Sequence, residues 1–126
     1  MSSNDNSAIG SITWRDLTVD DAPRVRDFYA HVVGWKPEPV KMGNYDDYNM
    51  LDANGQCVAG VCHRRGCNTA LPPQWLVYIA VANVAESMEK CIALGGKVID
   101  GPRKMGDKQF VVIQDPAGAV CALFGP

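Results

Sequence analysis

Two side chains in this sequence are candidates for proton transfer, and Asp16 is the first of them. It lies in the run Ile12–Val19, where side chains of an extended chain would alternate, so it shares one strand face with Trp14 and Thr18. A carboxylate on an inward strand face is costly to bury unpaired, which suits a general base or an anchor for a ligand. The same pattern also fits an aspartate that pairs with a nearby arginine or lies exposed at a cavity mouth.

His63 is the second candidate, and it is one of two histidines in the chain. It ends an apolar run that begins at Cys57, and Arg64 and Arg65 follow it. A histidine in this place suits an acid–base catalyst or a residue on the rim of a site.

The five cysteines do not predict a metal site. They are Cys57, Cys62, Cys67, Cys91 and Cys121, and none forms the Cys-x-x-Cys pair that is typical of zinc binding. We therefore expect free thiols, no metal ion and no other cofactor. Cys57 is a candidate ligand contact, although nothing in the sequence activates its thiol.

Length and charge limit the possible functions. A chain of 126 residues with a formal net charge of -2 fits one domain and gives no electrostatic case for nucleic acid. No apolar run approaches the roughly 20 residues of a membrane helix. Residues 1–11 are small and polar, so we expect a disordered tail, no secretion signal and cytoplasmic residence.

The candidate residues are placed by a unit that occurs twice along the chain. A strand, an amphipathic helix and three further strands are predicted from about residue 12 to 65, and again from about 74 to 126. Asp20–Asp21 begins the first helix and Gly34 ends it, while Asn83 and Gly95 do the same for the second. The strand near Trp35 is expected to be broken by two prolines, Pro37 and Pro39. The strand that begins at Lys97 is expected to stop at Asp100, before Gly101–Pro102.

Several motifs of these repeats resemble the vicinal oxygen chelate superfamily, which includes glyoxalase I, bleomycin-resistance proteins and extradiol dioxygenases. They are Asp27–Tyr29 with Val33–Trp35, Ala93–Val98, and the turn Asp115–Gly118. The resemblance covers about residues 10 to 126. It implies an α+β fold in which two tandem β-α-β-β-β modules form a curved mixed sheet around a cavity.

The resemblance also identifies four positions where metal-dependent relatives carry His, Gln or Glu. They correspond to Trp14 and Leu76 (or Trp75) in the first strand of each module, and to Ala59 and Ala122 in the last strand. None of these side chains has a donor that suits a metal ion. We therefore expect a metal-independent member, because glyoxalase I and dioxygenase chemistry needs the ion.

The cavity lining is then the candidate site. We expect Trp14, Leu76, Tyr78, Ala59, Ala122, Cys57 and Tyr48 to contact a ligand, Tyr48 because it belongs to an aromatic and acidic segment that begins at Lys41. The predicted function is the binding of a small, partly apolar molecule by a protein that forms a homodimer.

Two alternatives remain open. The protein could be a lyase or isomerase that uses Asp16 or His63 for proton transfer. It could also be a dimeric interaction module without a ligand, with Trp14 filling its cavity.

Overall fold

The computed structural model describes residues 8–126, apart from the side chain of Cys67, and the predicted tail residues 1–7 lie outside the described part. The described chain divides into two compact units. Arg15–Trp75 forms the first unit, and residues 8–14 together with Leu76–Pro126 form the second.

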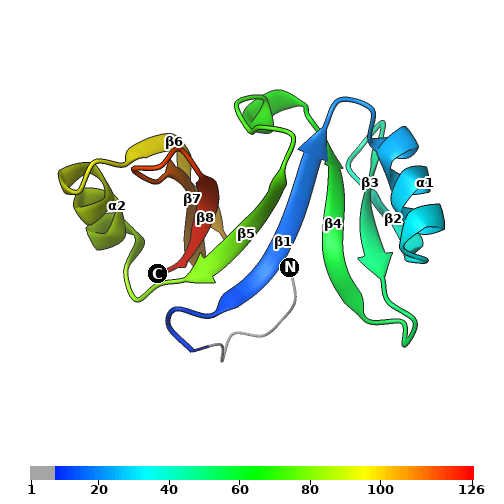
Figure 1. Ribbon diagram of the computed structural model, residues 1–126, viewed down its shortest axis with the longest axis horizontal. Coiled ribbons are helices and arrows are strands. Elements are labelled where there is room, and N and C mark those ends of the chain that lie inside the picture. The colour runs from blue at the N-terminus through cyan, green and yellow to red at the C-terminus, as the bar shows by residue number, and fades with distance from the viewer. Residues whose placement is uncertain (1–7) are drawn as a thin grey trace. The chain divides into compact units, whose positions relative to one another are not determined.

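Each unit contains one helix and the strands of one repeat. In chain order the elements are β1 (Ile12–Val19), α1 (Ala22–Val32), β2 (Lys36–Lys41), β3 (Asp46–Leu51), β4 (Cys57–His63), η1 (Gly66–Asn68), β5 (Trp75–Ala80), α2 (Val84–Ala93), β6 (Lys97–Met105), β7 (Lys108–Gln114) and β8 (Val120–Gly125) (Figure 1). The predicted α+β class and the two β-α-β-β-β modules are confirmed.

The two repeats have the same strand order. In the first unit the order is β2-β3-β4-β1, and in the second it is β6-β7-β8-β5. The first and last strands of each repeat run parallel, with Asp16 opposite Gly60 and Tyr78 opposite Ala122, while the remaining pairs are antiparallel. Asp16 and Tyr78 therefore occupy equivalent places.

Both helices begin where the sequence predicts. The carboxylate of Asp21 accepts the backbone N–H of Arg24 at 3.3 Å, and the side-chain oxygen of Asn83 accepts that of Glu86 at 2.9 Å. These contacts satisfy donors that the first helical turn leaves unpaired. Neither helix in the described part of the chain has the length and apolar run needed to cross a bilayer.

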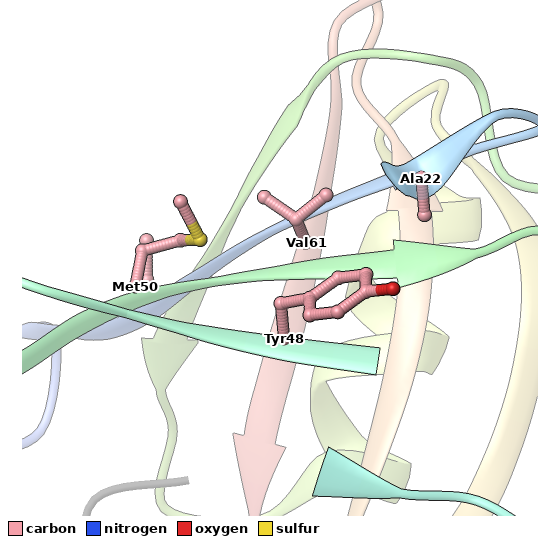
Figure 2. Close-up of a cluster of buried hydrophobic side chains, with 5 residues drawn as sticks. Ala22, Tyr48, Met50 and Val61 are labelled. Carbon is pink, nitrogen blue, oxygen red and sulfur yellow. The ribbon is translucent and has the colours of Figure 1, made fainter. Parts of the chain in front are cut away.

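The core of the first unit lies between α1 and one face of its sheet. Its buried members are Ala22, Tyr48, Met50, Ala59 and Val61, with Tyr29 and Trp75 among the residues packed against them. Figure 2 shows Ala22, Tyr48, Met50 and Val61 gathered on the same side of the strands. Trp75 Nε1 donates a hydrogen bond to the Tyr29 hydroxyl at 3.0 Å, which gives its buried N–H a partner.

The second unit has an equivalent core beneath α2. Val84, Val111 and Leu123 are buried, and Ile79, Met88, Val98 and Ile113 are among the side chains that pack against them. The helix-facing residues of both units thus follow the alternation of the strands.

Two strands differ from the prediction. β2 continues through Pro37 and Pro39, because it pairs on one side only and an edge strand tolerates residues without an N–H. β6 continues past Gly101–Pro102 to Met105, with register shifts on both sides of Asp100 that absorb the irregularity.

Residues 8–11, which we expected to belong to the tail, are tied to β5. The backbone N–H of Gly10 donates a hydrogen bond to the carbonyl oxygen of Ala80 at 2.7 Å. The N–H of Ala80 donates one to the carbonyl oxygen of Ser11 at 2.9 Å. These bonds join the residues just before β1 to the end of β5.

Candidate functional site

The strand registers assign the side chains of the second unit to two faces. Val111, Leu123 and Ile79 face α2, so Tyr78, Phe110 and Phe124 lie on the opposite face by alternation. Phe110 is opposite Phe124, and Ala122 is opposite Tyr78. We name this surface the aromatic face and define it by Tyr78, Arg103, Lys108, Phe110, Ala122 and Phe124.

The rings of the aromatic face are bordered by cations. The Tyr78 and Phe110 ring centroids are 6.1 Å apart at an interplanar angle of 48°. The Arg103 guanidinium lies 5.9 Å from the Phe110 centroid, and the Lys108 ammonium lies 5.8 Å from that of Phe124. Arg103 is held in place by an ion pair with Asp100. The face therefore combines apolar ring surface with positive charge.

The side chains of the aromatic face differ in their exposure to solvent. Tyr78 is 5% exposed and Ala122 is 0% exposed, so both lie buried at the base of this surface. Phe110, Phe124, Lys108 and Arg103 are half-buried. These four side chains form the accessible part of the aromatic face.

The corresponding surface of the first unit is acidic. Because Tyr48, Ala59 and Val61 pack beneath α1, the alternating residues of β3 and β4 lie on the opposite face. We name this surface the acidic face and define it by Asp16, Glu38, Asp47, Asn49, Gly60 and Cys62, which lie beside one another in register.

Cys62 is not a nucleophile in this setting. Burial raises the pKa of its thiol strongly, and the negative charges of Asp16 and Asp47 add to this effect. The thiol is therefore protonated at neutral pH, whereas the thiolate is the reactive form.

His63 and Asp47 form a close contact between an imidazole and a carboxylate in the first unit. Nδ1 of His63 is 3.4 Å from Oδ1 of Asp47, and both side chains are largely buried. The relative orientation of the imidazole and the carboxylate is not that of a hydrogen bond, so Nδ1 has no hydrogen-bond partner among the described residues. The Tyr45 ring packs edge-on against the histidine ring, with centroids 5.1 Å apart. The carboxylate and the tyrosine together fix the orientation of the imidazole.

Residues 8–123 match the family described as the Glyoxalase/Bleomycin resistance protein/Dioxygenase superfamily. The chain belongs to this superfamily. It is 33% identical over 119 residues to the "Putative glyoxylase CFP32" of Mycobacterium tuberculosis, covering 91% of this chain and 45% of that protein. It is 27% identical over 130 residues to the "Anthracycline biosynthesis protein DnrV" of Streptomyces peucetius, covering 93% of this chain and 47% of that protein. The chain thus spans about half the length of these curated relatives.

Solved structures of the superfamily share the fold. A member from Vibrio splendidus superposes with a TM-score of 0.60 at 9% identity, covering 92% of this chain and all of that one. A methylmalonyl-CoA epimerase in complex with methylmalonyl-CoA superposes with a TM-score of 0.53 at 13% identity, covering 94% and 95% of the two chains. At these identities the likeness extends to the fold alone.

The residues at the superfamily's metal-ligand positions do not fit a metal ion. The register changes one assignment, because a bulge between Met50 and Leu51 places Gly60 rather than Ala59 in the place equivalent to Ala122. Gly60 has no side chain, and Trp14, Leu76 and Ala122 offer no suitable donor. Within residues 8–126, no group of three or more His, Cys, Asp and Glu side chains is arranged to hold an ion.

The predicted site residues fall into separate places. Tyr48 and Ala59 lie in the core beneath α1 and not on the acidic face with Asp16. Trp14 and Leu76 are buried, at 5% and 3% exposure. Cys57 is exposed opposite Leu51, and burial of its sulfur still raises the pKa of the thiol.

Several residues of interest were not predicted. Phe110, Phe124 and Lys108 could have been found from the alternation in β7 and β8, which places both phenylalanines on the face of Tyr78. Asp47 had no such signal, because its contact with His63 joins β3 to the end of β4.

Proposed function

We propose that the protein binds a small, partly apolar molecule on the aromatic face without a metal ion. The observation that carries this proposal is the pair of half-buried rings, Phe110 and Phe124, opposite each other in register with Lys108 above the second ring. Stacking on such rings suits a flat aromatic ligand. The similarity to an anthracycline biosynthesis protein supports a ligand with fused aromatic rings.

The energy of such binding comes mainly from apolar contact. Covering about 100 Å² of ring surface contributes about 2.5 kcal/mol. A ligand that carries a negative charge would gain further from Lys108 and Arg103. Between the rings, Ala122 has a small side chain and Val112, opposite it in register, is buried.

The first test measures binding of the uncharged fluorescent probe N-phenylnaphthylamine. Phe110→Ala and Phe124→Ala should each weaken binding by about tenfold. Phe28→Ala is the matched control, because Phe28 is 56% exposed on α1 and lies in the other unit. Phe110→Leu keeps an apolar side chain and guards against loss of the fold. Absence of probe binding, or wild-type affinity in both ring variants, would overturn the proposal.

Metal independence has its own test. Protein dialysed against a chelator should bind N-phenylnaphthylamine as the untreated protein does, and elemental analysis should find no stoichiometric ion. Restoration of binding by one added divalent metal would contradict this part of the proposal.

A second candidate function is acid–base catalysis, as in a lyase or isomerase. The contact of 3.4 Å between Asp47 Oδ1 and His63 Nδ1 favours it, because a carboxylate at Nδ1 leaves Nε2 to exchange a proton. Turnover of a bound compound that is lost in His63→Gln, with probe affinity unchanged, would support this function. Turnover retained in that variant but lost in Asp16→Asn would move the role to Asp16.

Two expectations about the whole protein stay proposals: cytoplasmic residence and a homodimer. Light scattering after size exclusion tests the second. A mass of twice 13.7 kDa is the expected result, and a monomer at all concentrations would contradict it.

A further inference from the structure

A pocket of about 350 Å³ lies on the side of the first unit that carries α1. It is lined by Arg26, Pro37, Pro39, Asp46 and Tyr48. In register, Pro39 is opposite Tyr48 and Pro37 is opposite Met50, so these side chains share the helix-facing side of β2 and β3. The pocket is therefore separated from the acidic face by the sheet itself.

Two contacts orient the cation of this pocket. Nε of Arg26 donates a hydrogen bond to Oδ1 of Asp27 at 2.8 Å. The guanidinium carbon lies 4.7 Å from the centroid of the Tyr48 ring. These two contacts position the planar group before any ligand arrives, which lowers the entropy cost of binding a carboxylate.

The same pocket also contains an anion and an apolar surface. Asp46 lies at the start of β3, and within residues 8–126 the structure gives its carboxylate no ion pair. Lys41 is its neighbour in register and is exposed. The two proline rings add apolar surface and no backbone N–H. One positive group, one negative group and a flat apolar wall thus surround one space.

We propose that this pocket is a second small-molecule site, which binds a zwitterion of the α-amino acid type. The carboxylate of the ligand pairs with Arg26, its ammonium group pairs with Asp46, and its apolar side chain packs against Pro37 and Pro39. The site is independent of the aromatic face, because its residues all lie in the first unit.

The test titrates the protein with three matched probes and monitors binding by the changes in backbone amide chemical shifts. L-phenylalanine carries both charges, L-phenylalaninamide lacks the carboxylate, and phenylpropanoate lacks the ammonium group. L-phenylalanine should bind in roughly the millimolar range or tighter. Each of the other probes should bind about tenfold more weakly, because each loses one charged contact.

Two variants identify which side chain pairs with each charged group of the ligand. Arg26→Gln should remove the preference for L-phenylalanine over its amide, and Asp46→Asn should remove the preference over phenylpropanoate. Arg24→Gln on α1, and Lys41→Gln and Glu38→Gln on the neighbouring strand β2, are the controls, and all should keep both preferences. Absence of L-phenylalanine binding, or preferences that survive in both Arg26→Gln and Asp46→Asn, would overturn the proposal. N-phenylnaphthylamine binding should not change in any of these variants.

Discussion

Asp47 contacts His63 at two points. Its Oδ1 accepts the backbone N–H of His63 at 2.9 Å and lies 3.4 Å from Nδ1 of the same residue. The first contact joins β3 to the end of β4, and the second sets the ring. One side chain therefore links the stability of this strand end to the orientation of the candidate base.

The first prediction separates these two roles by stability. Asp47→Ala should lower the free energy of unfolding by about 1–3 kcal/mol, because a buried N–H loses its acceptor. Asp47→Asn keeps a side-chain oxygen and should cost less than half as much. Urea denaturation measures both, with Asp46→Ala as the neighbouring control. Equal losses in the Ala and Asn variants would show that the charge, not the hydrogen bond, is what matters.

The second prediction concerns the pH dependence of stability. The folded chain raises the pKa of Cys62 above the ordinary value of 9.0, by burial first and then by the charges of Asp16 and Asp47. Folding therefore favours the neutral thiol. This contribution to stability is fully present at pH values below the pKa of the thiol in the unfolded chain. Above it the unfolded chain releases the proton first, so stability falls by up to about 1.4 kcal/mol per pH unit.

Denaturation of the wild type and Cys62→Ala at several alkaline pH values tests this dependence. The variant should lose less stability as the pH rises. Cys57→Ala is the comparison and should change the pH profile less, because Cys57 is exposed and burial raises the pKa of its thiol less than that of Cys62. A wild type and a Cys62→Ala variant with parallel pH profiles would contradict the assignment.

The third prediction uses the repeat itself. Oδ1 of Asp52 accepts the N–H groups of Asn54 and Gln56 at 2.9 Å each. Oδ1 of Asp115 accepts those of Ala117 and Ala119 at 2.8 and 3.0 Å. Asp52→Ala and Asp115→Ala should therefore cost similar amounts, about 1–2 kcal/mol each. Thermal or urea unfolding measures this, and Asp107→Ala in the exposed β6–β7 turn should cost less.

These two turns also show why the fold was predictable. The pattern of an aspartate followed three residues later by glycine occurs before the last strand of each repeat, and both aspartates bond the same relative N–H groups. Local hydrogen bonding of this kind is encoded by neighbouring residues. Element order and the faces of β1 and β5 followed from such local signals and from alternation.

The site was less predictable because it depends on register. The bulge between Met50 and Leu51 moves Ala59 to the core side and places Gly60 beside Asp16. A shift of one residue reverses the face of every later side chain, and no local signal marks this bulge. The pocket beside Arg26 was missed for a related reason, since β2 was expected to be broken at Pro37.

The fourth prediction concerns the approach of α2 to β7. A Cβ atom at Gly96 would lie 2.6 Å from Sγ of Cys91 and 2.8 Å from the backbone oxygen of Gln114. Both contacts are shorter than van der Waals distance, so the helix end would have to move. Gly96→Ala should cost about 1–3 kcal/mol of unfolding free energy.

A double-mutant cycle identifies the cause of that cost. In a Cys91→Ala background the sulfur is gone, so Gly96→Ala should cost less than it does in the wild type. The relief should be incomplete, because the Gln114 oxygen belongs to the backbone and stays in place. Urea denaturation of the four proteins gives the coupling energy. A coupling of zero would show that the sulfur moves aside freely and that the approach of the Gly96 backbone to Gln114 alone requires glycine.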